Sequence, residues 1–103
     1  MSVIPIICQL SDPEKRQREA TLLAQFKSGL IGAAELENGL EFRLPGQQEW
    51  LTLAAELMIA ERECCPFLKF QLTAEPQMGE LTLQITGPAG TKEFVKTNFG
   101  RGK

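Results

Sequence analysis

The residues best suited to chemistry in this sequence are its three cysteines. Cys64 and Cys65 are adjacent, and Cys8 lies near the N-terminus. Thiolates are preferred protein ligands of soft metal ions, so three converging sulfurs would suit Hg(II), Cd(II), Cu(I), Zn(II) or a trivalent metalloid. Glu61 or Glu63 would add an oxygen ligand. We therefore predict a metal site formed by Cys8, Cys64, Cys65 and Glu61.

Other uses of the same cysteines remain open. A free cysteine often packs in a core as a small hydrophobic residue. A disulfide between Cys64 and Cys65 is a second alternative, but their Cα atoms lie about 3.8 Å apart across a trans peptide, below the usual disulfide range. Such a bond would be strained and easily reduced, so it would serve as a redox switch rather than as a structural link.

A catalytic thiol is the least favoured use of these cysteines. The C-terminus of a helix carries negative potential, and Glu61 and Glu63 add to it. Both effects raise a thiol pKa, whereas a catalytic cysteine needs a lowered one. A soft metal ion differs because it displaces the thiol proton itself.

Composition narrows the range of functions. The chain has 103 residues and a net charge of −2, with no His and no Tyr. A Ser-His-Asp arrangement and histidine metal ligands are thereby excluded. The charge gives no general attraction to nucleic acid or to an anionic membrane, and no apolar run is long enough to span a bilayer. The first residues lack the basic start of a signal peptide, so we expect a cytoplasmic protein.

Two predicted elements would bring the sulfurs together. Residues 3–10 alternate as a strand, with Cys8 on the same face as its aliphatic residues. A helix from about residue 47 or 48 to Cys64 carries a stripe of Trp50, Leu57 and Cys64 that faces the sheet. Pro66 ends this helix. The predicted strand would thus place the Cys8 sulfur, and the predicted helix the Cys64 sulfur, at the interface between sheet and helices.

The remaining elements follow from capping and alternation. A helix is predicted from Pro13 to about Ser28, with Gly29 as a left-handed terminator and Lys15 paired with Glu19. Two hairpins follow the two long helices, and a short helix is predicted over about residues 91–99. In the first hairpin, a three-residue loop places Leu36 opposite Leu40 and Ala34 opposite Phe42. In the second, a four-residue loop places Leu72 opposite Leu81.

The predicted fold class is α+β. The order is β-α-β-β-α-β-β-α, with an antiparallel sheet of four to five strands and helices on one face. Residues 1–100 are predicted to form a single domain, and residues 101–103 a frayed tail. Long edge strands leave a homodimer open.

The sequence also resembles a known group of proteins. Residues 63–70, which read Glu-Cys-Cys-Pro-Phe-Leu-Lys-Phe, together with residues 81–90 and residues 7–10, are similar to small bacterial proteins of unassigned activity. Similar segments occur as tails on mercury-responsive MerR-type regulators. The resemblance covers nearly the whole chain and implies a link to heavy-metal response. No helix-turn-helix precedes the domain in this sequence, so we do not expect it to be such a regulator itself.

The function predicted from the sequence is that of a cytoplasmic accessory or sensor domain that binds a soft metal or metalloid ion through its thiols. The alternative is a module that binds a small ligand between sheet and helices, or another protein, with the cysteines as core packing residues.

Overall fold

The structure is a computed structural model, and it describes residues 12–99. The described elements run in the order α-β-β-α-β-β-α, beginning with a helix. Their bounds are α1 Pro13–Ser28, β1 Gly32–Leu36, β2 Gly39–Leu44, α2 Gln48–Cys64, β3 Lys69–Ala74, β4 Leu81–Thr86 and α3 Thr91–Phe99. The strand predicted over residues 3–10 and the tail predicted over residues 101–103 lie outside the described residues.

The four described strands form one antiparallel sheet in the order β1-β2-β4-β3. The α+β class and the antiparallel sheet are thus confirmed. The two central strands alternate as expected, and their buried apolar side chains are Leu40, Phe42, Leu44, Leu81, Leu83 and Ile85. The opposite face is polar: the Gln84 amide donates to Glu41 at 2.8 Å, and Arg43 pairs with Glu80 at 3.1 Å.

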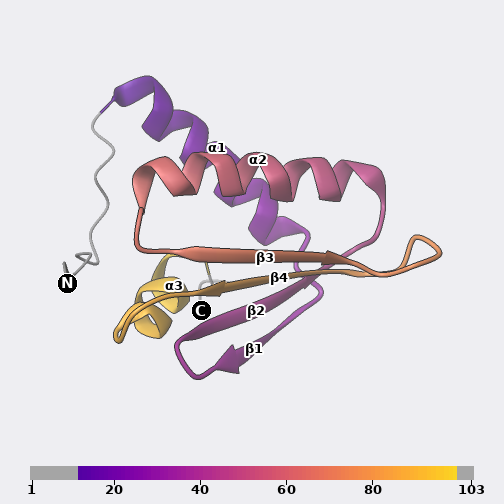
Figure 1. The fold of residues 1–103 in the computed structure, drawn as a ribbon. Coiled ribbons are helices and arrows are strands. Elements are labelled where there is room, and N and C mark those ends of the chain that lie inside the picture. Colours follow the sequence, from indigo (N-terminus) through magenta and orange to yellow (C-terminus); the bar gives the residue numbers. More distant parts are fainter. Residues whose placement is uncertain (1–11, 100–103) are drawn as a thin grey trace.

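The helices cover the apolar face of the sheet. α1 and α2 pack against each other and cross at an angle, and α3 packs beside β2 and β4 (Figure 1). The ring of Phe42 meets those of Phe26 from α1 and Phe99 from α3, with centroids 5.4 and 6.4 Å apart. One aromatic cluster therefore joins the first helix, the sheet and the last helix, and it holds the helices at fixed positions over the strands.

The start of α1 follows its prediction, whereas its end does not. The Asp12 side chain accepts a hydrogen bond from the Glu14 amide at 2.9 Å, as an N-cap should. Gly29 has a φ of −102°, so it is not the left-handed terminator that we predicted. A Cβ at Gly29 would lie 2.3 Å from the Trp50 ring. Glycine is needed here because α2 packs closely, not because the backbone turns.

The register of the first hairpin corrects the sequence-based prediction. Glu35 pairs with Leu40 and Leu36 with Gly39, so the loop has two residues rather than three. Glu35 thereby lies on the helix-covered face, which alternation of apolar residues had argued against. The reason is α3, whose lysines neutralise this carboxylate: the Nζ atoms of Lys92 and Lys96 lie 3.5 and 3.1 Å from its oxygens.

The second hairpin keeps the predicted faces with a different register. Leu72 pairs with Leu83 rather than with Leu81, and Ala74 pairs with Leu81. The shift is two residues, so every side chain keeps its face. The connection is longer than predicted because Gln77 and Met78 adopt positive φ angles of 61° and 60° and extend the turn. Among the described residues, no helix is long and apolar enough to cross a membrane.

Candidate metal centre

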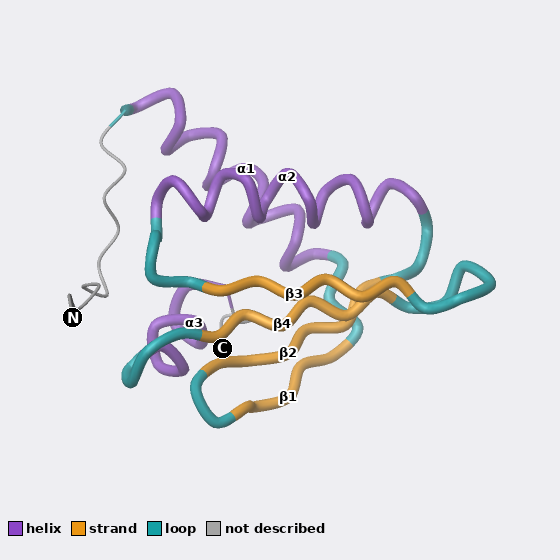
Figure 2. Tube along the Cα trace, in the orientation of Figure 1, coloured by secondary structure: helices purple, strands orange, loops and turns teal. Residues whose placement is uncertain are grey.

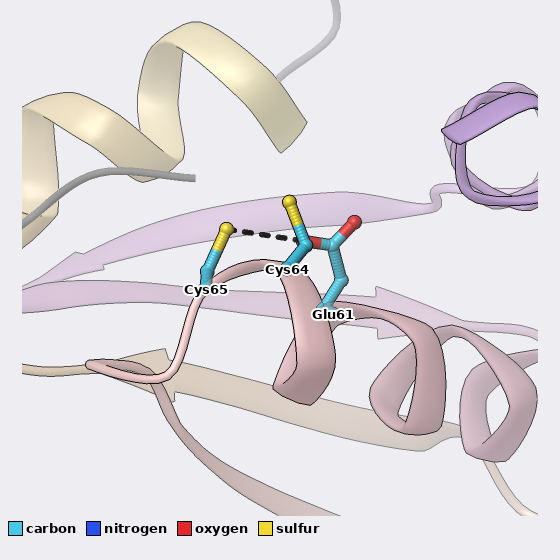
Figure 3. Close-up of side chains that lie close together, drawn as sticks. All are labelled: Glu61, Cys64 and Cys65. Carbon is cyan, nitrogen blue, oxygen red and sulfur yellow. Dashed lines mark hydrogen bonds between the residues drawn. The ribbon is translucent and has the colours of Figure 1, made fainter. Parts of the chain in front are cut away.

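The last turn of α2 places two cysteines and a glutamate together. The helix ends at Cys64, and Cys65 takes extended angles of φ −128° and ψ 79° because the next residue is a proline. The amide of Cys65 still donates to the Glu61 carbonyl and caps the helix. Figure 3 shows the side chains of Glu61, Cys64 and Cys65 projecting to the same side of this helix end.

These three side chains form a compact group of donor atoms. One oxygen of Glu61 and the sulfurs of Cys64 and Cys65 all lie within 4.8 Å of one another. The exposed fractions of the three residues are only 1%, 2% and 1%. The Cys65 thiol donates to Glu61 Oε1 at 3.6 Å, drawn as the dashed line in Figure 3. Three of the four ligands predicted from the sequence, Glu61, Cys64 and Cys65, thus lie together as a group that could hold a metal ion.

Glu61 is the unusual member of the group. Its second oxygen, Oε2, is buried and has no hydrogen-bond partner of normal geometry. Burial, and then the neighbouring Glu19 carboxyl of α1, raise the pKa of Glu61 to about 9. A carboxyl with such a pKa is neutral at pH 7, which is how a protein avoids burying an uncompensated charge. A bound cation would supply that compensation instead.

Cys65 responds to the same surroundings. Burial first, and then the Glu61 carboxyl, raise the pKa of the Cys65 thiol to about 12. Negative charge from Glu19 acts in the same direction. The sequence had indicated that the helix end and its acidic neighbours would raise a thiol pKa here, and burial proves to be the larger cause. Cys65 is therefore a neutral thiol at pH 7, unlike an activated nucleophile.

The other two cysteines, Cys64 and Cys8, are not equivalent to Cys65. Cys65 is a free cysteine, whereas Cys64 is disulfide-bonded in this structure. Cys8, the third predicted ligand, lies outside the described residues. Cys64 can bind a metal ion only after reduction, because a disulfide sulfur has no thiolate to offer.

Glu63 and Glu19 make other contacts than those predicted from the sequence. Glu63, an alternative oxygen ligand in the sequence analysis, is half exposed and pairs with Lys15 of α1 at 3.5 Å. Lys15 was predicted to pair with Glu19 instead. Since Lys15 reaches across to α2, Glu19 is left facing Glu61. Sequence reasoning missed Glu19, although it lies one turn before Leu22 on the buried side of α1.

The arrangement can hold a soft cation. Two sulfurs and a carboxylate oxygen meet at the negative end of a helix dipole, and Glu19 adds further negative charge nearby. No protein-family model matches the chain, and no similar protein is found among curated proteins or among solved structures. The geometry of Glu61, Cys64 and Cys65 is therefore the basis on which a function can be proposed.

Proposed function

We propose that the chain is an accessory or sensor domain that binds a soft metal ion, with Glu61, Cys64 and Cys65 as ligands. The observation that carries the proposal is the mutual distance of these three donor atoms, all within 4.8 Å, in a buried position. Thiolate sulfur selects ions such as Cd(II), Zn(II), Hg(II) and Cu(I) over hard ions such as Mg(II), which prefer oxygen and water.

The protonation of the site supports selectivity for thiophilic ions. The pKa values of Glu61 and Cys65 are raised to about 9 and about 12, so a metal ion must displace a proton from each at pH 7. Only an ion with high affinity for sulfur offsets that cost. Once bound, the ion would give Glu61 Oε2 the partner that it lacks.

The redox state of Cys64 sets a condition for binding. Its sulfur is disulfide-bonded, so the metal-binding form is the reduced protein. The cytoplasm, where we expect the protein, keeps thiols reduced. Cys8 is expected from the sequence as a further thiol ligand of the reduced form. The resemblance to tails of mercury-responsive regulators is in line with this class of ion.

The test is a titration of reduced protein with Cd(II) under anaerobic conditions. Cadmium-thiolate bonds absorb in the ultraviolet, so the absorbance counts the sulfurs bound. We expect a one-to-one complex. Cys65→Ser and Glu61→Gln should weaken the complex at least about tenfold, which is the lower end of the effect of losing even an outer-shell partner.

Glu63→Gln is the matched control, because Glu63 lies on the same helical turn with its carboxylate at the surface. It should bind Cd(II) like the wild type. Calorimetry in two buffers of different ionisation enthalpy should show proton release that rises as the pH falls below 9. Absence of thiolate absorption in the reduced protein, or equal binding by Cys65→Ser and wild type, would refute the proposal.

A further inference from the structure

A cavity lies at the outer edge of the sheet, lined by residues far from Cys64 and Cys65 along the chain. It has a volume of about 400 Å³ and lies between β1 and α3, next to β2. Its lining includes Ile31, Ala33, Glu35, Leu40, Phe42 and Lys96. We propose that this cavity binds a small molecule with an apolar body and a single carboxylate, held by the apolar residues of the sheet and by Lys96 of α3.

The cavity exists because the helices leave one strand uncovered. Figure 2 shows β1 at the edge of the sheet, away from α1 and α2. Ala33 lies on the same face as the fully buried Phe42, its partner in the register, yet Ala33 itself is exposed. Ile31 is 45% exposed at the start of this strand. The apolar layer of the sheet therefore extends beyond the helices that cover the rest of it.

The volume suits a small ligand. Ligand pockets usually measure about 300–1,000 Å³ and combine an apolar lining with a few polar groups. Here the apolar lining comes from β1, β2 and the residues just before β1, and the charged groups are Glu35 of β1 and Lys96 of α3. Ala33 lines the cavity on the same face of the sheet as Phe42. Its side chain is a single methyl group, which leaves the space open.

The polar groups at the cavity favour a negatively charged head group. Glu35 accepts a hydrogen bond from Lys96 Nζ at 3.1 Å, and Lys92 Nζ lies 3.5 Å from its other oxygen. An ammonium has three donors, so Lys96, which lines the cavity, keeps donors for a second acceptor. Glu93 also acts on Lys96, so two lysines face two glutamates. Because these charges balance, one added carboxylate would meet no net negative charge here.

The probe is octanoate, added to isotope-labelled full-length protein and followed through backbone amide shifts. We expect saturable one-to-one shifts at residues 31–35, residues 40–42 and α3, and weaker binding of 1-octanol, which lacks the charge. Ala33→Phe should abolish binding because its ring would occupy the cavity. Ala74→Phe is the matched control, since Ala74 is an exposed alanine of β3, the strand at the other edge of the sheet, and does not line the cavity.

A second variant tests the head group without altering the core. Lys96→Gln should weaken octanoate about fivefold, the upper range for a partly exposed ion pair, and should leave 1-octanol unchanged. The inference is overturned if the shifts are absent or lie elsewhere, or if Ala33→Phe binds octanoate like the wild type. Cd(II) binding at the cysteines is independent of each of these outcomes.

Discussion

Replacing Glu61 with glutamine should change how the stability of the protein depends on pH. The folded state holds Glu61 as a neutral acid because burial and the Glu19 carboxyl raise its pKa from an ordinary 4.5 to about 9. The unfolded chain releases that proton above about pH 4.5. The stabilising effect of the bound proton is therefore complete below pH 4.5, and it is lost progressively as the pH rises towards 9.

The size of this effect follows from the same two pKa values. One pH unit corresponds to about 1.4 kcal/mol for a single group, so the free energy of unfolding should fall by roughly 3 kcal/mol between pH 4.5 and pH 7. Glutamine has no proton to lose, and its carbonyl oxygen can still accept the hydrogen bond from the Cys65 thiol. We expect Glu61→Gln to be more stable than the wild type at pH 7, by on the order of 3 kcal/mol, and equally stable near pH 4.

The assay is urea unfolding at half-unit steps from pH 4.5 to pH 8, without reductant, so that Cys64 keeps its disulfide. Groups remote from Glu61 titrate equally in both proteins, so the difference between the two curves reports Glu61 and its immediate surroundings. Glu63→Gln should reproduce the wild-type slope, since that carboxylate is exposed and pairs with Lys15. Parallel curves for wild type and Glu61→Gln across this range would show that Glu61 is not held as a buried neutral acid.

The remaining predictions concern packing, thiol reactivity and a surface ion pair. Gly29→Ala should cost about 1–3 kcal/mol in urea unfolding, because its Cβ would clash with the Trp50 ring. Trp50→Leu in the same chain should relieve most of that cost, and a purely additive double variant would contradict the clash. Phe42→Ala should cost about 3–5 kcal/mol in the same assay, since the ring is fully buried among Phe26 and Phe99. Iodoacetamide should modify Cys65 slowly at pH 7.5 and rapidly in urea, by mass spectrometry, because burial raises the pKa of this thiol to about 12. The lysines of α3 lower the pKa of Glu35, so Glu35→Gln should reduce the melting temperature at pH 7 and have no effect well below pH 4.5, where the carboxylate is protonated.

Local sequence signals were sufficient for the helices and for the faces of the central strands. Asp12 and Pro13 mark the start of α1, and Pro66 ends α2 so that Cys64 and Cys65 stand at its last turn. The period of two in β4 puts Leu83 in the core. These features depend on backbone geometry and on neighbours a few residues away, and such information is local to the chain.

The pairing of Glu61 with the cysteines was also readable from the sequence, because residues four apart on a helix share a face. The role of Glu19 was not. Its position depends on how α1 crosses α2, and on Lys15 reaching Glu63 across that interface. Which carboxylate becomes buried therefore depends on charged residues of both α1 and α2.

The hairpin register was likewise decided by the tertiary structure. Alternation of apolar residues placed Glu35 on the polar face, but Lys92 and Lys96 arrive from α3, more than fifty residues later, and neutralise it on the other face. A strand at the edge of a sheet can carry a charge inward wherever a distant helix supplies the opposite charge. Within residues 12–99, the sequence alone determined the order of helices and strands and which sulfurs lie at a helix end. The packing of helices against that sheet decided which charges are buried, since burial depends on neighbours that the local sequence does not contain.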